Sequence, residues 1–177
     1  RKGPLTVPTP APHPPHQPPA GAGARPTIGR HGLDLIRHYD PWSPRPYHHW
    51  RGYLAIGYGH RLRPSDAQIV TRTQAELLLA QDCHLIGIYL GATTPIPLPQ
   101  RAWDAICSLL YDVGLLAYER SRLRTHINAG DHRAAYEEWS RFDDRAFNTL
   151  PGGLTRRRRH SEKGLYQSAY ITPDAAA

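Results

Sequence analysis

The chain has 177 residues, which suffices for one compact domain but not for two domains with separate full cores. Hydrophobic residues make up 40% and charged residues 21%, a balance that excludes a globally disordered chain and a membrane bundle. The 22 lysines and arginines outnumber the 15 acidic residues and give a net charge of +7. Such a charge favours polyanionic surroundings such as nucleic acid, anionic lipid or bacterial wall polymers.

Proline, alanine, glycine and histidine dominate residues 1–30, which predicts an extended arm because proline has no amide donor and a fixed φ. The arm is either an ordinary linker or a tether that contacts a protein partner. The chain begins with Arg1 and has no methionine. We therefore expect a processed product or fragment that is secreted, periplasmic, organellar or associated with a virion.

The two cysteines, Cys83 and Cys107, lie among apolar neighbours in segments with helical periodicity. This pattern predicts two buried free thiols rather than a disulfide or a zinc site. We expect no metal and no cofactor. No apolar run approaches the roughly 20 residues of a membrane-spanning helix.

Helical periodicity begins after Gly32 and predicts a short helix that ends near Pro41. The following segment is rich in proline, glycine and aromatic residues, and residues 53–60 within it predict the short strands of a small sheet. A long helix comes next, with Thr71 or Thr73 as its cap. A capping box is expected between Thr73 and Glu76.

Four further helices are expected in the second half of the chain. The first runs from about Gln100 to Gly114, and two short ones flank the turn at residues 128–131. The last begins after Gly153 and ends near Tyr166. The predicted fold is α+β and mostly helical, with a small β lobe and a helical lobe joined by a long helix. The predicted division of the chain is arm 1–30, domain 31–167 and tail 168–177.

Five segments carry a more specific pattern: Gly52-Tyr53-Leu54-Ala55-Ile56-Gly57-Tyr58-Gly59-His60, Gln74-Ala75-Glu76 with Gln81-Asp82, Tyr111-Asp112-Val113-Gly114, Asn128-Ala129-Gly130-Asp131 and Gly153-Leu154-Thr155-Arg156-Arg157-Arg158. In this order they resemble the phage-type lysozymes of glycoside hydrolase family 24, the muramidases of phage endolysins. The resemblance covers about residues 32–166. It implies the lysozyme-like fold and an activity that cleaves the β-1,4 bond between N-acetylmuramic acid and N-acetylglucosamine in peptidoglycan.

The resemblance also implies positions for the family's catalytic glutamate, aspartate and threonine. Counting back without gaps from residues 52–60 places them at Asp40, His49 and Ala55, and all three differ from the family. Glycoside hydrolysis normally needs a carboxylic acid and a second carboxylate or a positioned water. Asp40 keeps a carboxyl group, beside an arginine expected from the last helix. His49, or His48 if the loop differs by one residue, could serve as a general base.

By the same resemblance, substrate-binding positions fall at Tyr58, Gly59, Asp112, Arg156 and Arg157, with Arg156 or Arg157 expected to turn toward Asp40. An ion pair between the lobes is implied for His60 and Asp82. Their expected role is to orient the lobes rather than to act in catalysis.

Three functions remain open on the sequence. The first is a catalytically degenerate muramidase relative that binds glycan or serves as an accessory subunit of a larger assembly, with residues 1–30 contacting its protein partners. The second is an active muramidase with Asp40 as general acid. The third is a nucleic-acid-binding module, which ranks last because only charge and the arginine run at residues 156–159 favour it.

Overall fold

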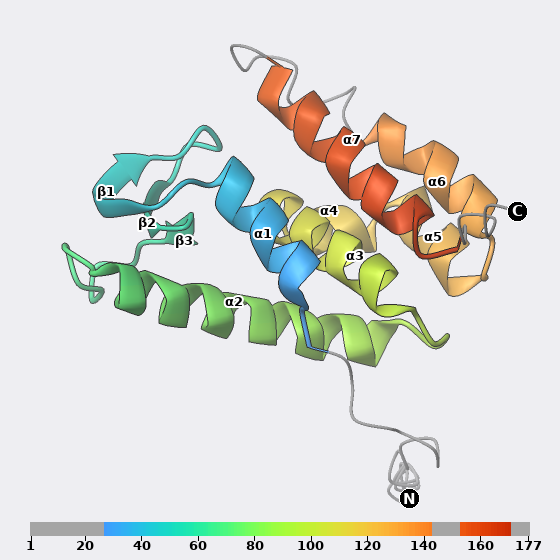
Figure 1. Ribbon diagram of the computed structural model, residues 1–177, viewed down its shortest axis with the longest axis horizontal. Coiled ribbons are helices and arrows are strands. Elements are labelled where there is room, and N and C mark those ends of the chain that lie inside the picture. Colours follow the sequence, from blue (N-terminus) through green and yellow to red (C-terminus); the bar gives the residue numbers. More distant parts are fainter. Residues whose placement is uncertain (1–26, 143–152, 171–177) are drawn as a thin grey trace, which may run out of the picture.

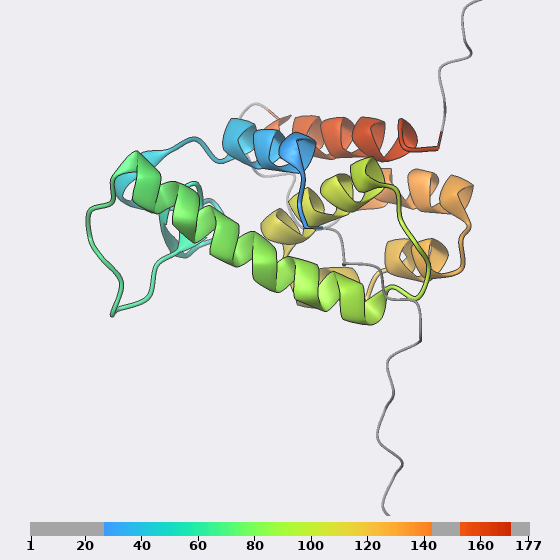
Figure 2. The ribbon, with the colours of Figure 1, turned by 60° about the horizontal axis from the view of Figure 1, so that its bottom comes forward.

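The computed structural model describes residues 27–142 and 153–170, and these form a small β lobe and a larger helical lobe (Figure 1). The predicted α+β, lysozyme-like architecture is confirmed. Helix α2 (Arg72–Thr93) runs from beside the sheet to the helical lobe, as Figure 2 shows. Most of the predicted arm, residues 1–26, and the end of the predicted tail, residues 171–177, lie outside the described residues.

The sheet has the order β1-β2-β3 and is antiparallel, with strands β1 (Ser43–His48), β2 (Leu54–Gly57) and β3 (His60–Arg61). The sequence did not predict β1, which contains Pro44 and Pro46. Proline removes a ladder hydrogen bond, so a strand of this composition is tolerated only at a sheet edge. The edge position of β1 and the irregular register between its two ends agree with that rule.

Helix α1 (Arg30–Tyr39) begins earlier than predicted, within the segment assigned to the arm. No side chain of its own caps the helix. The buried carboxylate of Asp104 accepts hydrogen bonds from the amides of Gly29 (2.6 Å) and Gly32 (3.3 Å) instead. A negative charge at a helix N-terminus satisfies amides that lack helical partners. Because Asp104 lies in another helix, 75 residues from Gly29, no local pattern in the sequence indicates this contact.

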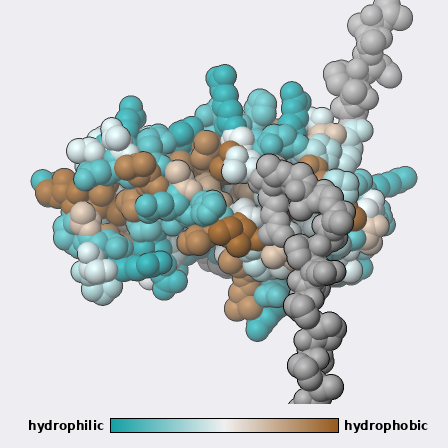
Figure 3. All heavy atoms as spheres, turned by 90° about the horizontal axis from the view of Figure 1, so that it is seen from below, coloured by the Kyte–Doolittle hydropathy of each residue, from teal (hydrophilic) through white to brown (hydrophobic). Residues whose placement is uncertain are grey.

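Helix α2 is capped by Thr71, whose hydroxyl accepts from the amide of Gln74 while the Gln74 side chain accepts from the amide of Thr71. The capping box predicted for Thr73 and Glu76 is therefore wrong. Glu76 pairs instead with Arg37 of α1 at 2.7 Å. On the face seen from below, hydrophobic patches lie among hydrophilic ones (Figure 3), and α2 exposes three large apolar residues: Leu77, Leu85 and Ile88.

The helical lobe is built around α3 (Gln100–Val113), which is buried along most of its length. Around it lie α4 (Leu115–Glu119), α5 (Arg122–Asn128), α6 (His132–Arg141) and α7 (Leu154–Gln167). All but the one-turn α4 were predicted, and Gly114, with φ +82°, ends α3 as expected. Two hydrophobic clusters result, one around α3 and one where α1, β2 and α2 meet. In the part of the chain that the structure covers, every helix is too short or too polar to cross a membrane.

Candidate functional site in the cleft between the lobes

Asp40 follows the last turn of α1, and its amide donates to the carbonyl of Ile36 at 2.8 Å. Its side chain is buried, and both carboxylate oxygens have protein partners. Nη1 of Arg158 donates to Oδ2 at 2.6 Å, while Nε2 of His49 lies 3.3 Å from Oδ1. The carboxylate thus links α1 to α7 and to the loop after β1.

His49 is also buried, and its ring stacks on Tyr53 with centroids 4.6 Å apart. The amide of Arg51 donates to Nδ1 of His49 at 3.3 Å. Because Nδ1 accepts this hydrogen bond, we assign the proton of the neutral ring to Nε2, which then donates to Asp40. Neither ring nitrogen is left with a lone pair facing the cleft.

Ala55 is fully buried in the middle of β2, where it pairs with Tyr47 on one side and Arg61 on the other. It does not line the cavity at Asp40. Of the three candidate catalytic positions, only Asp40 and His49 therefore line this cavity. Asp40 and His49 are in contact, whereas Ala55 contributes only a methyl group to the packing of the sheet.

The arginines of α7 divide between its two faces, and the predicted inward residues are wrong. Arg156 and Arg157 are exposed, while Arg158 and Arg159 are buried. Residues three and four apart share a face of a helix, and the buried face of α7 also carries Glu162. Both Arg158 and Arg159 pair with that carboxylate.

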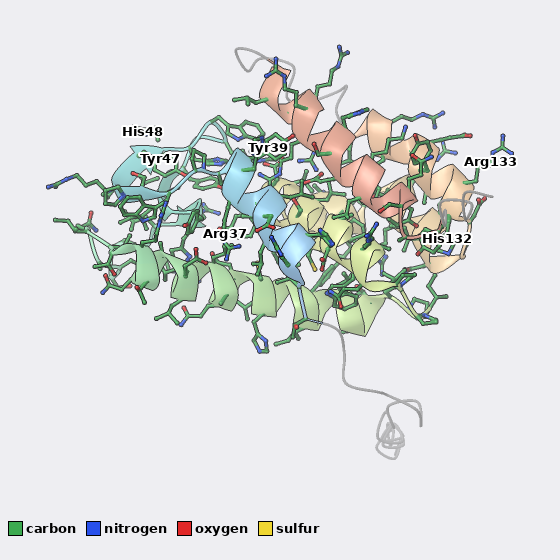
Figure 4. All side chains as sticks on the ribbon, viewed as in Figure 1. Arg37, Tyr39, Tyr47, His48, His132 and Arg133 are labelled. Carbon is green, nitrogen blue, oxygen red and sulfur yellow. The ribbon has the colours of Figure 1, made fainter. Side chains whose placement is uncertain are left out.

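A cavity of ≈ 410 Å³ opens beside Asp40 and has a largely aromatic wall. Asp40 and Arg158 lie in its lining. The labelled side chains in Figure 4 place Tyr39 at the end of α1, and Tyr47 and His48 on the small lobe. The aromatic side chains of its lining are Tyr39, Trp42, Tyr47, His48, His49 and Trp50. We call this space the aromatic cavity.

A second cavity has a volume of ≈ 460 Å³, and we call it the basic cavity. Arginines and a histidine from the small lobe contribute to its lining: Arg51, Arg61, Arg63 and His60. Asp112 lines both cavities. Burial alone would raise its pKa, but the charges of Arg158, Arg159 and Arg51 outweigh that effect and lower the pKa.

The remaining predicted binding positions differ in their surroundings. Tyr58 is buried in the hydrophobic cluster of the small lobe, and its carbonyl accepts from the hydroxyl of Tyr111 at 2.8 Å. Gly59 lines the basic cavity with φ +89°, and a Cβ on it would lie 3.2 Å from Cγ of Asp40. Glycine suits this position because the turn between β2 and β3 needs a positive φ and lies close to that carboxyl group.

His60 and Asp82 form the contact expected between the β lobe and the long helix. Nδ1 of His60 lies 2.7 Å from Oδ2 of Asp82, and Nε2 lies 3.7 Å from Asp66. The hydrogen bond to Asp82 raises the pKa of His60, although burial acts in the opposite direction.

Comparison with known proteins decides the family. Residues 37–161 match the phage lysozyme family. The endolysin of Acyrthosiphon pisum secondary endosymbiont phage 1 is 33% identical over 146 residues, which cover 80% of this chain and 99% of that protein. The chain belongs to the phage lysozyme family.

Solved structures of this lysozyme family agree with the fold. The muramidase domain of SpmX from Asticaccaulis excentricus superposes with a TM-score of 0.69 at 28% identity, covering 82% of this chain and 98% of that one. The endolysin of Escherichia coli O157:H7 phage FAHEc1 gives a TM-score of 0.68 at 25% identity, with coverage of 82% and 96%.

Sequence reasoning missed several cleft residues of this lysozyme-family chain. Arg158 and Arg159 share a helix face with Glu162, but this spacing alone does not show that the face is buried. Arg51, whose Nε donates to Asp112 at 3.2 Å, had no such signal because its partner is distant in sequence. The aromatic density of residues 39–50 did indicate the composition of the aromatic cavity.

Proposed function

We propose that this chain is a catalytically altered member of the lysozyme family that binds the glycan of peptidoglycan without cleaving it at the rate of a working muramidase. It would serve as a glycan-binding or structural accessory subunit. The observation that carries the proposal is the engagement of Asp40 and His49, whose polar side-chain atoms all have protein partners.

The acid position supports the proposal through geometry. A general acid must present a proton to the glycosidic oxygen, but both oxygens of Asp40 already face protein groups, Arg158 and His49. Aspartate is also shorter than glutamate by one methylene, about 1.5 Å. A misplacement of about 1 Å can cost on the order of 100-fold in rate.

The surroundings of His49, the candidate general base, also support the proposal. An imidazole can activate water only through an unprotonated nitrogen that water can reach. In His49 the unprotonated Nδ1 accepts from the amide of Arg51, and the ring is covered by Tyr53. Ala55 supplies no hydroxyl that could hold a water.

The aromatic cavity is suited to binding. Pyranose rings pack their C–H faces on aromatic side chains, and Trp42, Tyr47 and Trp50 provide such surfaces next to polar groups that could accept or donate hydrogen bonds. The positive net charge favours the anionic polymers that accompany peptidoglycan in bacterial walls. Contact of residues 1–30 with a protein partner stays a prediction.

Sedimentation with purified peptidoglycan tests the binding. We expect the protein to sediment with the insoluble polymer and Trp50→Ala to lose most of that binding, since one wall of the aromatic cavity is removed. Leu77→Ala is the matched control because it removes an exposed apolar side chain of α2, outside both cavities. Equal sedimentation of all three proteins would contradict binding in the cavity, and no sedimentation would contradict glycan binding altogether.

A further inference from the structure

The aromatic cavity and the basic cavity share one lining residue, Asp112 of α3. At that point Nε of Arg51, in the loop between β1 and β2, donates to Oδ1 of Asp112 in α3 at 3.2 Å. The ion pair therefore includes the residue that the two linings share.

This ion pair is buried and held from both sides. The side chain of Arg51 is 13% exposed and that of Asp112 only 1%. The guanidinium of Arg51 lies over the ring of Trp50, 4.3 Å from its centroid, while Arg159 holds the other oxygen of Asp112. Buried ion pairs with additional partners are costly to break because each charge left behind loses its compensation.

The loop after β1 makes a second contact, between His49 and Asp40. His49 reaches Asp40, and the amide of Arg51 donates to the same imidazole. The loop after β1 thus contacts α1 through His49 and α3 through Arg51. The loop that carries both contacts thus contributes His49 and Trp50 to the aromatic cavity and Arg51 to the basic cavity.

We propose that Arg51 determines which glycans the cleft accepts, by closing the passage between the aromatic and basic cavities to a continuous strand. The proposal rests on the proposed function and specifies its ligand. Each cavity then takes a short oligosaccharide or the end of a glycan chain, and the interior of a long strand is not bound. Longer fragments gain little affinity, because their extra sugars find no surface beyond the cavity.

Calorimetric titration with peptidoglycan strands freed of stem peptides and fractionated by length tests this. For the natural protein we expect affinities for the disaccharide, tetrasaccharide and hexasaccharide to agree within about threefold. Arg51→Ala opens the passage, and its affinity is expected to rise roughly tenfold or more from disaccharide to hexasaccharide. Asp112 keeps its contact with Arg159 in this variant, so the fold is expected to persist.

Arg45→Ala is the matched control, because Arg45 is an exposed arginine of β1, the strand before the Arg51 loop, and lines neither cavity. It should reproduce the flat length dependence of the natural protein. A steep rise of affinity with length in the natural protein would overturn the inference alone and leave the proposed function standing. No binding of any fragment by the natural protein would overturn both.

Discussion

At the scale of single residues, the cleft depends on a buried group of charges centred on Arg158. Its guanidinium contacts Asp40, Glu162 and the carbonyl of Ser108. Burial by itself would lower the pKa of Arg158, but the surrounding carboxylates, Asp40 foremost, outweigh it and raise that pKa. The charges are tolerated in the interior only because each one has a partner.

Replacing Arg158 with methionine is expected to cost about 3–5 kcal/mol of unfolding free energy, because Asp40 loses its cationic partner in a buried setting. Arg157→Met, at the exposed neighbouring position, should stay within about 0.5 kcal/mol of the natural protein. Denaturation in urea, followed by circular dichroism, measures both. Similar values for the two variants would show that the buried network does not stabilise the fold.

The burial of Arg158, rather than of its neighbours in α7, could not be predicted from the sequence. An arginine of the last helix beside Asp40 was predicted, but Arg156 or Arg157 was expected there, whereas the structure places Arg158 beside Asp40. Four successive arginines point in four directions, and only the position of the helix relative to its neighbours decides which ones are buried.

At the scale of elements, α1 is fixed to the helical lobe through its N-terminus. The carboxylate of Asp104 receives the amides of Gly29 and Gly32 and the side-chain amide of Gln100. Because α1 carries Asp40 at its other end, this anchor also sets the position of the candidate site.

Asp104→Asn keeps the size of the side chain but removes its charge and presents an NH₂ group to amide donors. We expect a loss of about 1–2 kcal/mol of unfolding free energy, as for the loss of a helix cap and its dipole interaction. Asp34→Asn, which alters only half-exposed ion pairs of the same helix, should cost less than about 0.5 kcal/mol. Thermal melting compares the two, and an equal effect would contradict the anchoring role of Asp104.

The contact between His60 and Asp82 predicts a pH dependence. The pKa of His60 is raised above its ordinary value of 6.5, so the stabilisation is fully present below that value and is lost as the pH rises through the raised pKa. We expect the unfolding free energy of the natural protein to exceed that of Asp82→Asn by about 1 kcal/mol near pH 6 and by much less near pH 9. Urea titrations over this range measure the difference. A difference that grows with pH would contradict the assignment.

Much of the element order could be predicted, because helical periodicity and glycine or proline at the ends are local signals. The strand β1 was missed since two prolines argue against a strand, and only pairing with β2 makes it one. The capping box was misplaced by two residues because Thr71 and Thr73 are equivalent as caps in sequence.

At the scale of the whole molecule, the small lobe and the helical lobe meet at the cleft. His49 and Arg51, from the loop after β1, contact Asp40 and Asp112 there. The sequence predicted a cleft and several of its residues. It could not predict the ion pair of Arg51 and Asp112, because the pair joins positions far apart in the chain. The chain thus keeps the family fold, while Asp40, His49 and Asp112 in its cleft contact other side chains of the protein.

Release of soluble fragments from purified peptidoglycan, compared between the natural protein and Asp40→Asn, tests the central claim most directly. Our account predicts the same background release from both, because Asp40 is held by Arg158 and His49. The triple variant Asp40→Glu, His49→Asp and Ala55→Thr serves as the gain-of-function comparison and is expected to release more. Release by the natural protein that Asp40→Asn abolishes would contradict the account and identify Asp40 as the acid of an active muramidase.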